Sequence, residues 1–401
     1  MAGLISFCLL GSGCAAPKDF NKRLSQLVRP YRFHVMQWEA STFAEGVKQV
    51  VCGRDKATDN EMEKVNGYFD TVARIRTLKS EIEAIKAGNK TGELAPLETE
   101  LSELQPKRDL LINAVERVIA GQIRDILVQQ DIYHPADRYL KLKMVFPLVD
   151  FKLDKPPHLL VISPRDRIES MREIVLRQEV AVAEMEQIEG EVDKLGVSSI
   201  VVGLGGFGGT YPTFVTNEAS LRFTVDAAAE EWLHQYLSFK PLGFRYVLDL
   251  IGIRRNYEIA TMNETVASMA SKEIGGMVVE SYYPDSKSAD GEQSPKSGFD
   301  FDSEMREIRR AVDEYLAKGE IEQAEAFMEA KRQYLVSKGY HIRKLNQAYF
   351  AFYGAYADRP SSISPIGDEL QRLREQSASL KEFLTTVSSL TSRKDLLESL
   401  K

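Results

Sequence analysis

The 401-residue sequence contains very little cysteine. Its three cysteines are Cys8, Cys14 and Cys52, and all of them fall in the N-terminal part of the chain. So small a number builds neither a disulfide framework nor a metal site made of several thiolates. The sequence therefore excludes both of these arrangements.

Excess positive charge is absent as well. The chain has 52 lysines and arginines against 59 aspartates and glutamates, a net charge of −7, and no basic cluster stands out. Proteins that bind nucleic acids usually carry such a cluster, so we expect no nucleic-acid partner. With 43% hydrophobic and 28% charged residues the composition is that of a folded globular protein. The length is sufficient for two or three domains.

Long apolar runs are also missing. The apolar run at 3–13 is shorter than the roughly 20 residues that span a bilayer, and it suits the hydrophobic part of a secretory signal. Residues 10–14 resemble a bacterial lipoprotein box. That resemblance implies a signal and anchor segment over 1–16, lipidated at Cys14, and a location at the extracytoplasmic face of the cell envelope. The alternatives are a buried N-terminal segment and an incomplete gene start.

Two helical stretches follow, separated by a glycine-bounded break at 88–92. In both, apolar residues recur three and four positions apart, which is the period of an amphipathic helix. The positions are Val65, Phe69, Val72, Ile75, Leu78, Ile82 and Ile85, then Leu94, Leu97, Leu101, Leu104, Leu111, Val115, Val118 and Ile126. We predict an antiparallel helical hairpin domain over 17–145, in which Pro106 kinks the second arm or starts a new helix. Its expected role is a structural or partner-docking arm.

The rest of the chain, 146–401, is expected to form a second domain of α+β type. Apolar runs at 158–163 and 198–203 predict buried strands, and a helix is predicted between them from 165 to about 195. A small sheet with a helix packed on it follows from this order. Helices are predicted again beyond 302, ending in two amphipathic helices, and residues 284–300 form a polar loop of disordered type. The predicted fold class is therefore α+β and mostly helical.

A glycine-rich stretch at 203–209 follows the second predicted strand. It satisfies the dinucleotide-binding pattern G-x-G-x-x-G, but that pattern requires a helix immediately afterwards, and residues 210–215 are of extended type. We therefore expect a glycine turn that leads into an edge strand. Two interpretations of that strand stay open: it pairs with the backbone of a peptide substrate, or it makes no contact with substrate.

Two helices carry the residues with the clearest chemical pattern. Alanine-rich residues from 227 lead into Glu230, Glu231 and His234, and positions four apart project from one helix face. A second helix carries Glu264 in the stretch 263–267. The arrangement resembles the H-E-x-x-H motif of the gluzincins, zinc metallopeptidases that take a third ligand from a glutamate on a following helix. Glu230 stands where the family has histidine.

The resemblance implies that Glu230, His234 and Glu264 hold zinc or, with two oxygen ligands, a harder divalent metal such as manganese. It implies that Glu231 is the general base that activates water. Tyr340, His341 and Arg343 are candidates for stabilising the oxyanion. It also implies a zincin-like domain with a small sheet ahead of the metal helix. The C-terminal part, with Asn346 and the aromatic run after it, resembles bacterial membrane-anchored aminopeptidases.

Three functions are compatible with these residues. The first is a metal-dependent peptidase of aminopeptidase type, acting on a peptide or protein substrate, with activity impaired by Glu230. The second is a catalytically inactive zincin-fold scaffold of the envelope that binds a protein partner through its helical hairpin. The third is a structural helical protein in which the motif is accidental.

Overall fold

A computed structural model describes residues 18–33, 59–86, 90–133, 145–250, 252–284 and 299–401. The described chain is mostly helical and contains two three-stranded sheets, which confirms the predicted mostly helical α+β class. The predicted anchor segment 1–16 and nearly all of the predicted loop 284–300 lie outside these residues. Their roles therefore stay predictions. None of the described helices is both long enough and apolar enough to cross a bilayer.

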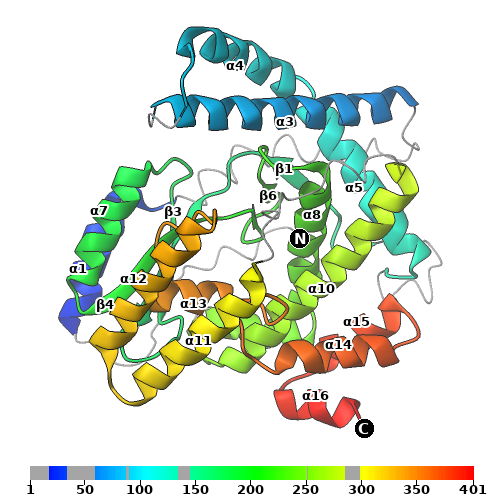
Figure 1. Ribbon diagram of the computed structural model, residues 1–401. Helices are drawn as coiled ribbons and strands as arrows, with labels where there is room; N and C mark the ends of the chain where they lie inside the picture. Colours follow the sequence, from blue (N-terminus) through cyan, green and yellow to red (C-terminus); the bar gives the residue numbers. More distant parts are fainter. Residues whose placement is uncertain (1–17, 34–58, 87–89, 134–144, 251, 285–298) are drawn as a thin grey trace.

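The helices fall into three groups along the chain (Figure 1). The N-terminal group comprises α1 (Lys18–Val28), the short 3-10 helix η1 (Arg29–Tyr31), α3 (Asp59–Lys86), α4 (Leu94–Asp109) and α5 (Ile112–Gln129). The middle group comprises α7 (Val182–Asp193), α8 (Leu221–Ser238), α9 (Pro241–Leu250) and α10 (Tyr257–Tyr282). The C-terminal group comprises α11 (Phe301–Ala317), α12 (Ile321–Ser337), α13 (Gln347–Tyr353), α14 (Ile366–Gln376), α15 (Leu380–Ser389) and α16 (Arg393–Ser399).

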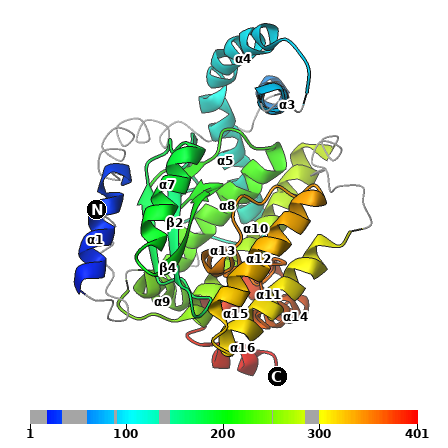
Figure 2. The same ribbon diagram turned by 60° about the vertical axis from the view of Figure 1, so that its left-hand side comes forward.

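The first sheet is antiparallel, with the order β3-β2-β4. Its strands are β2 (His158–Pro164), β3 (Arg172–Leu176) and β4 (Val197–Gly203). Leu160 and Ile162 pack with α1 and α7 on one face, whereas Leu159 and Val161 pack with α13 on the other (Figure 2). Because both faces are covered, β2 and β4 are apolar throughout rather than alternating.

The prediction of one helix over 165–195 was wrong in its first half. Residues 172–176 form β3, which pairs with β2 and buries Ile174 and Leu176 against α1 and α7. The helix α7 begins only at Val182. Ile174 and Val175 are β-branched and suit a strand, and the open edge of β2 gives them a partner. The C-terminal end also differs, since three helices, α14 to α16, stand where two were predicted.

The second sheet has the order β1-β6-β5. It comprises β1 (Phe151–Leu153), β5 (Gly206–Phe207) and β6 (Thr213–Val215). We predicted an edge strand after the glycine turn. Instead β6 is the central strand, and the edge strand β5 is formed by the glycine-rich stretch itself. Both β5 and β6 contact α8, so the glycines lie against that helix.

The predicted helical hairpin is divided into three helices. Pro106 lies inside α4, whose last residue is Asp109, and the chain restarts as α5 at Ile112. Helices α3 and α4 lie at one end of the molecule, while α5 packs against α8 and α10 (Figure 1). The largest apolar cluster joins Ile119 and Ile123 of α5 with residues of α8 and α10. The two predicted domains therefore share one core.

An ion pair between a buried glutamate and a half-buried arginine joins α7 and β4 to the segment before α13. Glu189 is 3% exposed; its carboxylate accepts hydrogen bonds from the Val201 N–H (2.6 Å) and from the Arg343 guanidinium, 2.9 Å from Nη1 to Oε2. Arg343 also donates to the Val201 carbonyl. Arg343 was a predicted oxyanion donor, and these contacts give it a structural role.

We predict that Glu189→Ala lowers the free energy of unfolding by about 2–3 kcal/mol, because a buried backbone N–H and a half-buried guanidinium lose their carboxylate partner. Denaturant unfolding measures the change. Glu100→Ala is the matched control: its pair with Arg74 is 40–45% exposed, and its loss costs at most about 1 kcal/mol. Equal losses in the two variants would contradict the structural role of Glu189.

Candidate metal centre

Helices α8 and α10 bring the predicted metal ligands together. Ser220 caps α8 by accepting from the Phe223 N–H, and Asn256 caps α10 by accepting from the Ile259 N–H. The two helices lie side by side in the molecule (Figure 1). Small buried residues permit this close approach. They are Ala227, Ala228 and Ala229 on α8, and Ala267, Ala270 and Gly275 on α10.

Glu230, His234 and Glu264 form a cluster that we call the candidate metal centre. A ligand atom of each lies within 4.8 Å of the others. His234 Nε2 is 3.8 Å from Glu264 Oε2, and their side chains are 20% and 10% exposed. Metal bonds of about 2.0–2.2 Å would bring the ligand atoms to within about 4 Å of each other. Side-chain movements of less than about 1 Å would bring the three ligand atoms to these separations, so the three residues fit a divalent cation.

Neighbouring side chains fix the orientation of His234. Its Nδ1 lies 3.1 Å from Nδ2 of Asn263, and its ring stacks on Tyr246 with 6.1 Å between ring centres. Nε2 therefore faces Glu264. If Nε2 binds a metal, the ring proton is on Nδ1, and the Nδ1–H group can donate a hydrogen bond to Oδ1 of Asn263. This oxygen is buried and has no hydrogen-bond partner among the described residues. The amide orientation and the histidine tautomer thus change together.

Glu231 lies against the glycine-rich edge strand. A Cβ atom added to Gly206 would overlap with Oε1 of Glu231, and one added to Gly208 would overlap with Oε2. Glycine at both positions therefore makes the space for this carboxylate. The helix that a nucleotide-binding loop requires does not follow, because the chain passes into β6.

Carboxylates outnumber cations around the candidate metal centre. Burial raises the pKa of Glu231 well above its ordinary value, and the charges of Glu230 and Glu264 raise it further. The pKa of Glu230 is raised by burial, which outweighs the opposing effect of His234. Burial also raises the pKa of Glu173, on β3, and the charge of Glu264 adds to it. A divalent cation would relieve this repulsion, since opposite charge favours the ionised carboxylates.

The sequence interpretation missed two tyrosines at this centre. Burial raises the pKa of Tyr246 and Tyr356 well above the ordinary value, and the charge of the nearby Glu264 carboxylate raises both further. Arg359 lies over the Tyr356 ring, 4.3 Å from its centre. Its positive charge partly opposes the rise in the pKa of Glu230 that burial causes. Tyr356 ends the aromatic run that begins at Tyr349. The aromatic run was the only sequence feature that could have indicated Tyr356, but no rule of residue spacing predicts that it lies close to α8.

The three predicted oxyanion donors are held elsewhere. Tyr340 stacks on Phe301, with 4.3 Å between ring centres, and belongs to the apolar cluster of α11 and α12. His341 is exposed. Arg343 pairs with Glu189. Within the described chain, none of the interactions recorded for these three residues involves the candidate metal centre.

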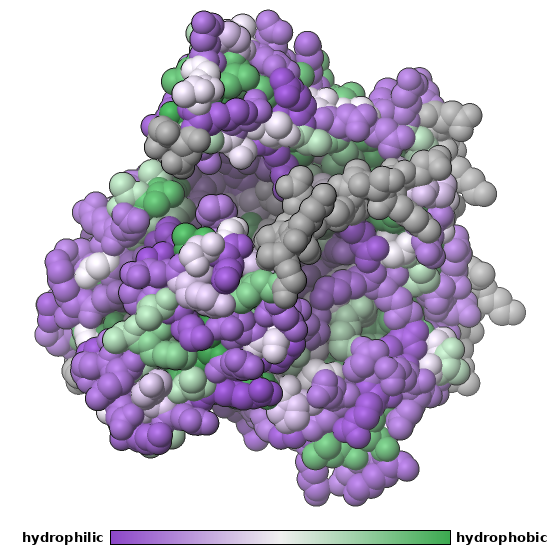
Figure 3. All heavy atoms as spheres, in the orientation of Figure 1, coloured by the Kyte–Doolittle hydropathy of each residue, from purple (hydrophilic) through white to green (hydrophobic). Residues whose placement is uncertain are grey.

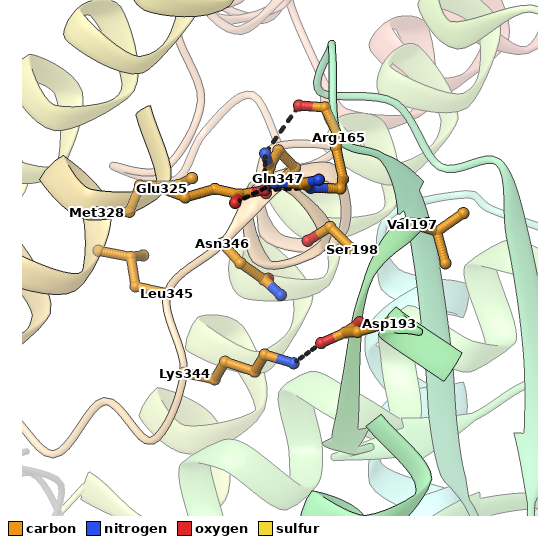
Figure 4. Close-up of a pocket in the computed structure, with 10 residues that line it drawn as sticks. All are labelled: Arg165, Asp193, Val197, Ser198, Glu325, Met328, Lys344, Leu345, Asn346 and Gln347. Carbon is orange, nitrogen blue, oxygen red and sulfur yellow. Dashed lines mark hydrogen bonds and ion pairs between the residues drawn. The ribbon is translucent and has the colours of Figure 1, made fainter. Parts of the chain in front are cut away.

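A cavity of about 330 Å³ lies between β4, α12 and the segment ahead of α13 (Figure 4). Its charged side chains pair across it: Arg165 with Glu325 at 2.6 Å, and Lys344 with Asp193 at 2.8 Å. No residue of the candidate metal centre lines it. We therefore assign it no part in the chemistry.

Comparison with known proteins gives no further identification: no family model matches the chain, and neither a curated protein nor a solved structure is significantly similar.

We predict that Gly206→Ala lowers the free energy of unfolding by about 1–3 kcal/mol, because its methyl group overlaps with the Glu231 carboxylate. The loss should largely disappear in a Glu231→Ala background, a coupling that a double-mutant cycle measures by denaturant unfolding. Gly190→Ala on α7 is the control, since open space surrounds that position. Equal losses with and without the Glu231 side chain would show that Glu231 is not the obstacle.

Proposed function

We propose that this protein is a metal-dependent hydrolase of peptide bonds with a gluzincin-like centre in a zincin-like domain. One observation carries the proposal: Glu230, His234 and Glu264 converge from two helices, next to a carboxylate that lies against a glycine edge strand. An acid-rich cluster with an oriented histidine suits a divalent cation. A buried carboxylate beside it suits the transfer of a proton.

Each residue has a distinct role in the proposed reaction. Glu230, His234 and Glu264 hold the cation, which supplies Lewis-acid polarisation of the substrate carbonyl when bound. Glu231 takes a proton from the attacking water and passes it to the leaving amine, a role favoured by its raised pKa. The Tyr356 hydroxyl is the candidate donor to the developing oxyanion, in place of Tyr340, His341 and Arg343. β5 offers an edge for the substrate backbone.

The ligand set favours a harder metal than the usual two-histidine set does. Two carboxylates and one imidazole present two oxygen donors and one nitrogen donor, and oxygen-rich sites shift preference from zinc toward manganese. Two negative ligands also neutralise most of the charge of a divalent ion. Either metal is therefore a candidate, and manganese competes better here than at a two-histidine site.

We predict that the chain, purified without chelators, holds close to one equivalent of zinc or manganese, measured by elemental mass spectrometry. His234→Ala should remove the metal, because it deletes the single nitrogen ligand of the centre. His341→Ala is the matched control, since that histidine is exposed and outside the centre. A wild-type chain that stays metal-free after incubation with either ion would refute the centre and favour the inactive scaffold.

We predict that Glu231→Gln lowers the rate of peptide hydrolysis by about 10²–10⁴-fold while metal content is unchanged, because the amide keeps the shape of the side chain but takes up no proton. Rates on a mixed peptide library, followed by mass spectrometry, measure the loss. Glu191→Gln, on the surface of α7, serves as the control. An unchanged hydrolysis rate in Glu231→Gln would remove Glu231 from the mechanism.

Two further parts of the proposal concern location and partners. Envelope attachment through Cys14 follows from the lipoprotein-type segment at 1–16. Helices α3 and α4, at one end of the molecule, provide the surface for a protein partner (Figure 1). In the alternative function, a scaffold without catalysis, that surface alone carries the activity.

A further inference from the structure

The segment around α9 exposes large apolar side chains. Phe239 is 59% exposed, Phe244 57% and Ile253 70%. Each of the three is followed directly by a cationic residue. These are Lys240, Arg245 and Arg254. On the face of the molecule that Figure 3 shows, by contrast, the exposed hydrophobic residues form small groups that hydrophilic residues separate.

Segment 239–255 has a net positive charge, whereas the chain as a whole has a net negative charge. Residues 239–255 carry four cationic side chains against one carboxylate, whereas the whole chain has a net charge of −7. The single carboxylate, Asp249, is buried and accepts a hydrogen bond from the Asn256 N–H at 2.6 Å. Arg255 and Arg32 both lie near Arg172: burial lowers the pKa of Arg172, and the charges of these two arginines lower it further. Positive charge is therefore concentrated beside exposed apolar groups.

The apolar surface continues onto a second part of the chain. The Phe146 ring lies 5.3 Å from that of Phe239, and both Phe146 and Leu148 are 41% exposed. Helix α9 lies at the lower left of the molecule in Figure 2, far from α4 at the top. We call the exposed apolar and cationic side chains of 239–255, together with Phe146 and Leu148, the α9 surface.

We propose that the α9 surface docks on an anionic lipid bilayer. Aromatic and aliphatic side chains insert at the boundary between headgroups and acyl chains, while lysine and arginine extend to the phosphates. The negative remainder of the chain is repelled by such a bilayer, so this face is the one that approaches it. A second copy of the chain fits poorly, because two positive surfaces repel.

Docking would also position the candidate metal centre. Tyr246, on α9, stacks on His234. The centre therefore lies one helix away from the proposed bilayer contact. The docking surface itself does not depend on the proposed hydrolase function, since it rests on residues outside the centre.

Co-sedimentation of the full chain with vesicles tests the proposal. Vesicles of phosphatidylcholine alone are compared with vesicles of phosphatidylcholine and phosphatidylglycerol in equal parts. We expect binding to the anionic vesicles only, weakened by added salt. The pair Arg245→Gln and Arg254→Gln should weaken binding about 30-fold, since each cation near an anionic surface contributes about 1 kcal/mol. Phe244→Ser with Ile253→Ser should weaken it at least about 10-fold.

Matched controls keep the N-terminal segment and change exposed residues elsewhere. Lys107→Gln with Lys318→Gln removes two exposed cations, and Leu110→Ser changes an apolar side chain that is 84% exposed. Both should bind like wild type. The charge pair alone still tests the proposal if the apolar pair fails to fold. Absence of binding to anionic vesicles, or equal binding by wild type and the α9 variants, would overturn it. Dimerisation abolished by Phe244→Ser, without vesicle binding, would assign the surface to a second copy instead.

Discussion

Close packing of α8 against α10 is the constraint on which the chemistry of this protein depends. The helices meet through alanine and glycine, and this brings Glu230 and Glu264 to His234, with Glu231 close to the two carboxylates and few cations nearby. Burial and mutual repulsion raise the pKa values of Glu230 and Glu231. A fold that gathers carboxylates in this way is stabilised by protonation or by a cation. The convergence of the ligand atoms favours the cation.

The residues around the candidate metal centre also orient its side chains, and each of them leaves one polar group of the centre free to bind a ligand. Asn263 engages Nδ1 of His234 and leaves Nε2 facing Glu264. Gly206 and Gly208 leave space for the Glu231 carboxylate. The sharp corner between α8 and α9 needs Gly243, where a Cβ atom would overlap with the Leu237 backbone, and that corner returns Tyr246 to the centre. These contacts orient groups rather than merely fill space.

Local patterns in the sequence predicted α8, α10 and the strands β2 and β4, but neither the strands β3 and β5 nor the packing of these elements. The spacing of Glu230 and His234 is a property of one helix and could be predicted. The approach of Glu264 depends on how α8 and α10 pack, and Tyr356 arrives from a loop with no spacing rule. The predicted helix over 172–176 is a strand, and its strand character depends on pairing with β2. Arg343 resembled a catalytic donor, yet a buried glutamate far away in the sequence pairs with it.

Charge divides the molecule into regions with different chemistry. Carboxylates converge inside, between α8 and α10, whereas cations gather outside, along α9 and its connection to α10. Both arrangements cost free energy in isolation, since like charges repel. A bound cation would offset the first, and the anionic surface that we propose as a partner would offset the second. Helix α9 links the two regions, because Tyr246 stacks on His234 while Phe244 is exposed beside the cations. That complementarity links the metal centre to the membrane-facing surface proposed for this chain.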